Sequence, residues 1–200
     1  FGLEFDGGAA AVEVKACADF LGRVCHGVFH FYKIGFANGI KRGHGDAGLI
    51  RENPPSGMAG ATIRAMLVEK NAPLQTCNTF GIAARAQALV RVRSAQDVQN
   101  VLTHPTLARA GLFVLGGGSN IVLTGDVSAT VLKMEIKGRR LLHESDTQWV
   151  VEAGAGESWH DTVAWTLAQG WPGLENLALI PGTVGAAPVQ NIGAYGVELQ

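Results

Sequence analysis

The residues best suited to chemistry are the glycine-rich run Gly116-Gly117-Gly118-Ser119-Asn120. Consecutive glycines let several backbone N–H groups point into one concavity, which suits a phosphate or a diphosphate. Ser119 and Asn120 would add side-chain donors beside those amides. The run is not a dinucleotide fingerprint of the form Gly-x-Gly-x-x-Gly, because Ile121 stands where the third glycine is required. On spacing alone, the run fits either a phosphate-binding loop or a plain turn.

A second glycine junction, Gly154-Ala155-Gly156-Glu157-Ser158, lies between a predicted strand and a predicted helix. A helix N-terminus favours an anion, so this junction could bind a phosphate, although a tight connection would use the same residues. Two such loops in one small unit are consistent with an extended, phosphate-bearing ligand held between them.

A third cluster extends from Pro172 to Gly196 and combines many prolines and glycines with little charge. That composition is unusual for a solvated loop and indicates irregular backbone packed against another surface. Backbone that approaches a flat ligand closely requires small residues, so this stretch is also compatible with ligand binding.

Alternating strand and helix signals surround these clusters. Short apolar or alternating patterns predict strands over residues 88–93, 112–115, 121–123, 130–134 and 148–152. Ser94 predicts the start of a helix that reaches Leu102, and Ser158 predicts the start of another that reaches Ala168. From about Asn78 onward, the sequence therefore indicates a mixed α and β unit.

Composition argues against several classes of function. Sixteen Lys and Arg residues against 17 Asp and Glu residues give a net charge of −1, which removes any whole-chain argument for nucleic-acid binding. No apolar run reaches the ~20 residues that cross a bilayer, so no membrane partner is expected. The cysteines at 17, 25 and 77 have no CxxC spacing, which fits reduced thiols in a cytoplasmic setting. Cys25, His26 and His30 lack a partner cluster and form a poor zinc site, so no metal is expected.

Several motifs, in the same order, closely resemble the UDP-N-acetylenolpyruvoylglucosamine reductases, flavoproteins of bacterial peptidoglycan synthesis. They are Asn78-Thr79-Phe80-Gly81-Ile82, residues 116–120, Gly154 to Trp159, Gly173 to Gly182 and Gln190 to Gly196. The resemblance implies an α+β fold, an FAD-binding module of the p-cresol-methylhydroxylase type in which two α+β lobes hold the cofactor between them. We expect a first lobe over residues 71–125 and an incomplete second lobe over residues 126–200, with the C-terminal substrate domain missing.

The resemblance also implies which residues bind FAD. The loop of the first lobe would hold the diphosphate, and the second lobe would line the ribityl chain and the flavin. The expected cofactor residues are Gly116, Gly117, Gly118, Ser119, Asn120, Gly154, Ala155, Gly156, Pro181, Gly182, Gly185, Asn191, Gly193 and Tyr195. For Tyr195, contact with the flavin or substrate region and a packing role fit equally well.

In the resembled family, NADPH reduces the flavin, and the reduced flavin converts a UDP-sugar enolpyruvyl ether to UDP-N-acetylmuramate for cell-wall synthesis. The family's Arg, Ser and Glu catalytic groups follow the motif at Tyr195, so we expect them beyond Gln200 and none in this chain. The resemblance further implies a small-molecule substrate and a cytoplasmic monomer.

Two alternative functions and one segment stay open. The same type of FAD-binding module serves other flavin oxidases and dehydrogenases, and a phosphate loop can also persist in a non-catalytic nucleotide-binding remnant. Residues 1–70 have no counterpart in the resembled family, and glycines are scattered through them without a helix or strand period. An ordered extension, a disordered one and an unrelated upstream translation are all compatible with that segment.

Overall fold

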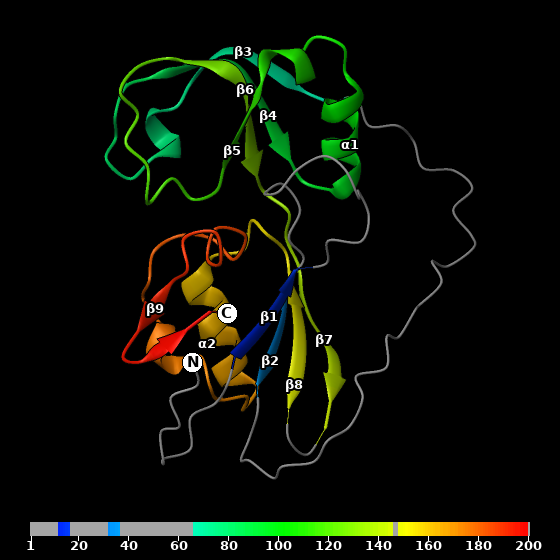
Figure 1. The fold of residues 1–200 in the computed structure, drawn as a ribbon, viewed down its shortest axis with the longest axis vertical. Coiled ribbons are helices and arrows are strands. Elements are labelled where there is room, and N and C mark those ends of the chain that lie inside the picture. Colours follow the sequence, from blue (N-terminus) through cyan, green and yellow to red (C-terminus); the bar gives the residue numbers. More distant parts are fainter. Residues whose placement is uncertain (1–11, 17–31, 37–65, 146–147, 200) are drawn as a thin grey trace, which may run out of the picture.

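The computed structural model describes residues 12–16, 32–36, 66–145 and 148–199, which form two lobes, one above the other in Figure 1. The upper lobe contains one four-stranded sheet. The lower lobe contains a second four-stranded sheet and a small two-stranded hairpin. The predicted α+β fold is confirmed.

The upper sheet mixes antiparallel and parallel pairing. Its strands are β3 (Val68–Pro73), β4 (Arg85–Val92), β5 (Leu112–Leu115) and β6 (Val127–Met134). Strand β3 runs antiparallel to β4, whereas β4 and β5 both run parallel to β6. The helix α1 (Ala95–Thr103) lies in the crossover from β4 to β5, which parallel pairing requires. Figure 1 shows that the carboxyl ends of β4 and β6 face the lower lobe.

Alternation along the strands of the upper sheet separates two buried clusters. Val90 and Leu132 point to the face covered by α1, where Val98 and Val101 are buried. Leu89 and Val131 belong to the opposite face, together with three other buried core residues, Leu74, Cys77 and Leu115. Because successive residues of a strand point to opposite faces, both faces of this sheet are apolar.

The lower lobe places one longer helix beside its antiparallel sheet. The strands are β1 (Val12–Ala16), β2 (Tyr32–Phe36), β7 (Arg139–Glu144) and β8 (Trp149–Ala153). The helix α2 (Trp159–Ala168) follows β8 and packs Trp159 and Val163 against Val151. The 3₁₀ turn η3 (Glu175–Leu177) and the hairpin β9 (Gly193–Ala194) and β10 (Val197–Glu198) complete the lobe.

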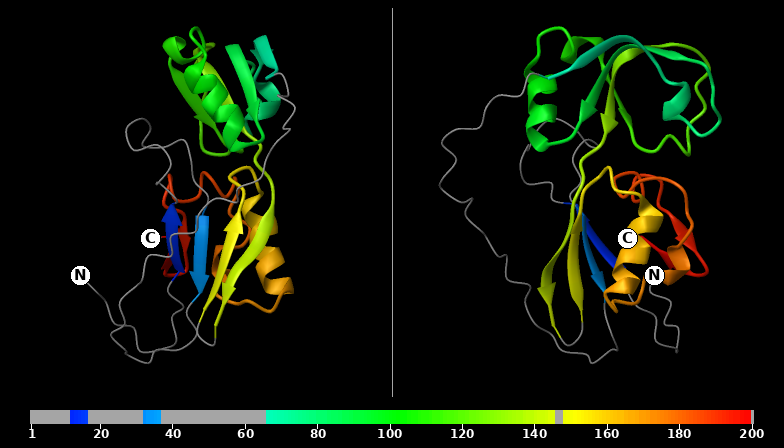
Figure 2. Two further views of the ribbon diagram at one scale, coloured as in Figure 1. Left: turned by 90° about the vertical axis from the view of Figure 1, so that its right-hand side faces the viewer. Right: turned by 180° about the vertical axis from the view of Figure 1, so that it is seen from behind.

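The lobes are joined by residues 135–138, which run from β6 into β7 (Figure 2). The expected boundary at 125/126 precedes β6, yet β6 pairs with β4 and β5 of the upper sheet. We therefore propose that the division between the lobes falls within residues 135–138.

Both helix starts were predicted correctly from their caps. The Ser94 side chain accepts a hydrogen bond from the Asp97 amide at 3.2 Å, and the Ser158 side chain accepts one from the Asp161 amide at 3.3 Å. The strand predicted at 112–115 coincides with β5, whereas the strand predicted at 121–123 is wrong. Ile121 and Leu123 pack against the apolar cluster under the sheet without pairing to a strand, which explains the apolar pattern there.

Of residues 1–70, the structure describes 12–16, 32–36 and 66–70, so most of this segment, including Cys17, Cys25, His26 and His30, lies outside the described residues. Strand β2 pairs antiparallel with β8, and β1 pairs with β2. In the described ranges, no helix is both long and apolar enough to cross a membrane, and no group of three metal-ligating side chains occurs.

Candidate cofactor site

The run Gly116 to Asn120 directly follows β5, at the carboxyl end of the parallel part of the upper sheet. In open sheets with parallel strands, ligands bind at this edge, where loops rather than side chains of the core are presented. The lower lobe faces the same edge (Figure 1). The predicted phosphate loop therefore lies where the two lobes meet.

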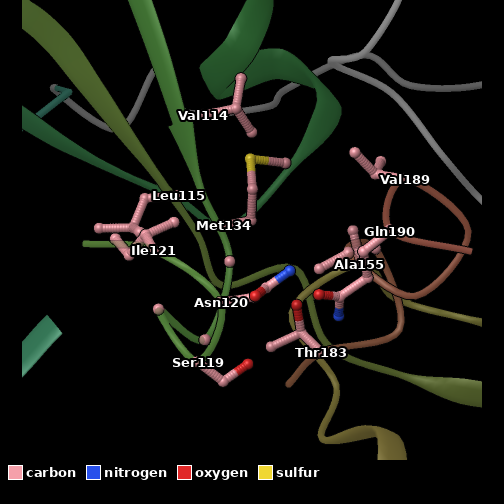
Figure 3. A pocket seen from close by; sticks show the side chains of 15 residues that line it. Val114, Leu115, Ser119, Asn120, Ile121, Met134, Ala155, Thr183, Val189 and Gln190 are labelled. Carbon is pink, nitrogen blue, oxygen red and sulfur yellow. The ribbon is translucent and has the colours of Figure 1, made fainter. Parts of the chain in front are cut away.

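A cavity of about 230 Å³ lies at this junction and takes its walls from both lobes. Figure 3 shows Ser119 and Asn120 from the upper lobe opposite Thr183 and Gln190 from the lower lobe. The full lining is Val114, Leu115, Gly116, Gly117, Gly118, Ser119, Asn120, Ile121, Met134, Ala155, Thr183, Gly185, Ala186, Val189 and Gln190. Mostly apolar walls with a few convergent polar groups are typical of a small-molecule site.

Two carbonyl groups of the loop accept hydrogen bonds from the upper lobe. The Gly118 carbonyl accepts hydrogen bonds from the Thr79 amide at 3.1 Å and from Thr79 Oγ1 at 3.3 Å. Lys133 Nζ donates to the Gly116 carbonyl. Within the described part of the chain, none of the amides of residues 117–120 donates a hydrogen bond to another group. Unused amides beside a cavity are the donors that an anion requires.

Gly118 is required by close packing as well as by its backbone angle. Its φ is +73°, and a Cβ at this position would lie 2.0 Å from the carbonyl oxygen of Cys77. The loop thus packs directly against the backbone of the buried residues Cys77 and Asn78. Asn78 in turn is fixed by its side-chain amide, which donates to the carbonyls of Leu74 at 2.9 Å and Ile82 at 3.1 Å.

The loop also approaches the lower lobe closely. A Cβ on Gly116 would lie 2.8 Å from Thr183 Oγ1, and a Cβ on Gly117 would lie 3.3 Å from Gly182 Cα. Both glycines therefore leave space at the lobe junction that any larger residue would fill.

Thr183 Oγ1 is a buried side-chain oxygen without a hydrogen-bond partner, the only such atom in the described ranges. The surrounding backbone is fixed, since the Trp159 amide donates to Gly182 at 3.1 Å and the Val184 amide donates to Glu157 at 2.9 Å. A buried hydroxyl is costly unless something bonds to it. Together with the unused loop amides, this orphaned hydroxyl fits a ligand rich in phosphate and hydroxyl oxygens, such as FAD.

The second glycine junction packs against the segment that joins the lobes. A Cβ on Gly154 would lie 2.4 Å from the Ile136 carbonyl oxygen, and one on Gly156 would lie 2.6 Å from Glu135 Cα. Glu157 accepts a hydrogen bond from the Gly138 amide at 2.7 Å and lies 3.7 Å from Arg139 Nε. The junction therefore packs tightly against residues 135–138, the segment that joins the lobes.

Charged side chains cluster beside the cavity. Arg91 donates to Glu135 at 2.6 Å and to Glu69 at 2.9 Å, and Arg93 donates to Glu135 at 3.1 Å. Hydrogen bonds to the two carboxylates raise the pKa of Arg91. Burial would raise the pKa of Glu135, but hydrogen bonds from Arg91 and Arg93 outweigh it and lower that pKa overall. Burial lowers the pKa of Lys133.

The structure places half of the fourteen expected cofactor residues at the cavity and the others around it or farther away. The cavity lining includes Gly116, Gly117, Gly118, Ser119, Asn120, Ala155 and Gly185. Gly156 and Pro181 line two adjoining hollows, Gly182 touches the loop, and Gly154 packs against Ile136. Asn191, Gly193 and Tyr195 lie outside these hollows, around the β9–β10 hairpin. Tyr195 has φ +52° and is 88% exposed.

Sequence reasoning did not name as site residues several members of the cavity lining, nor Lys133, which lines the adjoining hollow and bonds to the loop; the lining residues are Val114, Leu115, Ile121, Met134, Ala186, Val189 and Gln190. Lys133 and Met134 lie within the strand predicted at residues 130–134, but the sequence pattern does not show which strands pair with it or that it lies beside the loop. Thr183 falls within the stretch from Pro181 to Gly185, which the resemblance implied would line the ribityl chain and the flavin.

The chain is similar to both curated and structurally solved proteins. It is 61% identical over 138 residues to a UDP-N-acetylenolpyruvoylglucosamine reductase from Azoarcus sp. (strain BH72), covering 67% of this chain and 40% of the relative. A reductase of the same name from Burkholderia orbicola (strain MC0-3) is 59% identical over 128 residues, covering 64% of this chain and 37% of the relative. The chain thus spans well under half the length of these curated relatives.

A crystal structure of UDP-N-acetylenolpyruvylglucosamine reductase from Thermus caldophilus matches with a TM-score of 0.52 and 27% identity. The match covers 67% of this chain and 46% of the solved chain. A family model described as FAD binding domain matches residues 86–200, which is more than half of the sequence and includes every expected cofactor residue. The chain therefore belongs to the FAD binding domain family.

Proposed function

We propose that the chain is the FAD-binding part of a UDP-N-acetylenolpyruvoylglucosamine reductase. The whole enzyme would use NADPH to convert UDP-N-acetyl-enolpyruvoylglucosamine to UDP-N-acetylmuramate, as a cytoplasmic monomer that supplies peptidoglycan synthesis. The observation that carries the proposal is the cavity where the loop of residues 116–120 faces the orphaned hydroxyl of Thr183. High identity to curated UDP-N-acetylenolpyruvoylglucosamine reductases supports this reductase over other flavin oxidases or dehydrogenases.

In this proposal, the residues of the chain bind and orient the cofactor. The amides of residues 117–120 would donate to the diphosphate, and Ser119 and Asn120 would add side-chain donors. Thr183 would donate from the facing lobe, while Ala155, Gly185 and Met134 would provide close, apolar walls. Bound FAD supplies the hydride-transfer chemistry. We assign no catalytic group to the chain.

The junction at residues 154–157 would keep the site assembled. The Gly156 amide donates to the Ile136 carbonyl at 2.9 Å, so the cavity wall at Ala155 is held against the segment that joins the lobes. A wall that is already fixed lets a cofactor bind without a large ordering cost.

The test is an absorption spectrum of the purified chain after incubation with FAD and gel filtration. We expect a retained flavin band near ~450 nm in the wild type. The band should be lost in Gly117→Val, because the new side chain would meet Gly182 Cα, and kept in Gly125→Val, where nothing lies within 4 Å of the added Cβ. A colourless wild type would contradict the proposal and indicate a non-binding remnant.

A second measurement identifies the reaction. The chain would be fused at Gln200 to the remaining part of the Azoarcus relative and supplied with NADPH and UDP-N-acetyl-enolpyruvoylglucosamine. We expect NADPH oxidation that depends on the UDP-sugar. A yellow fusion that oxidises or reduces only other substrates would point to a different flavin oxidase or dehydrogenase.

A further inference from the structure

Lys133 lies directly behind the loop at residues 116–120. It belongs to β6 and pairs in register with Leu115 of β5 on one side and with Arg91 of β4 on the other. Leu115 is the last residue of β5, so the loop begins beside Lys133. The lysine is half-buried, and its Nζ donates to the Gly116 carbonyl.

This hydrogen bond fixes the direction of a peptide group that faces the cavity. The carbonyl of Gly116 and the amide of Gly117 belong to one peptide unit, and no described peptide bond is cis. In a trans peptide the C=O and the N–H point in opposite directions. Lys133 therefore holds the carbonyl inward and turns the Gly117 N–H away from itself, so that this amide remains free to serve a ligand.

The charge of Lys133 is not neutralised by an ion pair within the described ranges. The neighbouring basic residues do form ion pairs. Arg91 and Arg93 bind Glu135, and Lys137 Nζ lies 4.0 Å from the Glu157 carboxylate. Burial lowers the pKa of Lys133, which is the signature of an ammonium placed in a partly desolvated position. An uncompensated charge of this kind is stabilised when an anion binds nearby.

We propose that Lys133 is a positioning residue for the diphosphate of a dinucleotide bound at the loop of residues 116–120. Its ammonium orients the Gly117 amide through the Gly116 carbonyl and supplies positive charge from behind the loop. This inference rests on the proposed FAD-binding function and adds a residue outside the glycine motifs. It predicts that the ligand is recognised through its charged diphosphate, and riboflavin, which lacks phosphate, serves as the comparison.

The test compares Lys133→Met, Lys133→Arg and Lys70→Met in the full 200-residue chain. Lys70 is an exposed lysine of β3 in the same sheet and controls for the loss of one charge. Flavin fluorescence titrations would give the Kd for FAD and for riboflavin at low and high salt. We expect Lys133→Met to raise the Kd for FAD about tenfold and to make its salt dependence shallower. Lys133→Arg should restore most of the FAD affinity and most of its salt dependence. Lys70→Met should behave like the wild type.

Three outcomes would overturn the inference. If the wild type binds FAD and Lys133→Met binds it equally well with the same salt dependence, Lys133 has no role in diphosphate binding. The same conclusion follows if Lys133→Met weakens riboflavin and FAD equally, since that loss would be a packing effect. If the wild type itself binds no FAD, the proposed function fails, and the role of Lys133 fails with it. Thermal unfolding without FAD shows whether each variant is folded.

Discussion

Thr183 Oγ1 lies so close to Gly116 that a Cβ built on the glycine would come within 2.8 Å of it. The two residues belong to different lobes, and the hydroxyl has no hydrogen-bond partner in the described part of the chain. A glycine thus makes room for a buried polar atom that pays a desolvation cost without compensation. Such an arrangement is expected where a bound ligand completes the bonding.

The first prediction concerns Thr183→Val, which replaces the hydroxyl by a methyl group of similar shape. Without FAD, this change should leave the free energy of unfolding unchanged or raise it by up to ~1 kcal/mol, because an unsatisfied buried hydroxyl is removed. In the presence of FAD, the Kd should rise about tenfold, since one hydrogen bond to the ligand is lost. Chemical unfolding and fluorescence titration measure the two effects.

Thr183→Ser provides the matched control, because it keeps the hydroxyl and loses only the methyl group. Its Kd for FAD should stay close to that of the wild type. A valine variant that is markedly less stable than the wild type, with unchanged FAD binding, would show that the hydroxyl serves the fold and not the ligand.

The second prediction concerns the turn at Gly118. Alanine there would have to adopt φ +73° and would place its Cβ 2.0 Å from the Cys77 carbonyl oxygen. The backbone strain alone costs about 1–3 kcal/mol, and the steric conflict adds to it. We expect Gly118→Ala to lower the free energy of unfolding by more than about 2 kcal/mol and to abolish FAD retention. Gly125→Ala, which meets no atom within 4 Å, should change neither quantity, and equal effects at both glycines would contradict this assignment.

Short sequence patterns predicted the strands and helices around the cavity better than they predicted the residues that line it. The strand at 112–115 and the caps at Ser94 and Ser158 depend on neighbouring residues, and all three agree with the structure. The error at residues 121–123 arose because an apolar run that packs as coil has the same composition as a short strand. Lys133 could not be found locally, because its importance depends on which distant segments the fold places beside the loop. The missing hydrogen-bond partner of Thr183 Oγ1 likewise becomes visible only in the folded chain.

The third prediction concerns the contact between Glu157 and the end of the segment that joins the lobes. Glu157 is buried and accepts a hydrogen bond from the Gly138 amide at 2.7 Å. Glu157→Ala should therefore lower the free energy of unfolding by about 1–3 kcal/mol and weaken FAD binding, because the junction that carries Ala155 of the cavity wall loses a buried hydrogen bond. Glu152→Ala removes an exposed pair with Arg140 and should cost less than about 1 kcal/mol. Denaturant unfolding of both variants is the measurement, and a larger loss at Glu152 would overturn the expectation.

The fourth prediction follows from the lowered pKa of Glu135, whose hydrogen bonds from Arg91 and Arg93 outweigh the effect of burial. A carboxyl group that binds protons less readily when folded stabilises the protein above its unfolded pKa, which is ordinarily near 4.5. That stabilisation is lost as the pH falls below this value toward the folded pKa. In wild type, unfolding midpoints measured from pH 7 down to pH 3 should therefore fall more steeply below about pH 4.5 than in Glu135→Gln, which cannot titrate. Arg91→Met should also flatten this part of the curve, since it removes a donor that favours the charged form. A difference between wild type and Glu135→Gln that stays constant across the whole range would show that the carboxylate contributes no pH-dependent stability.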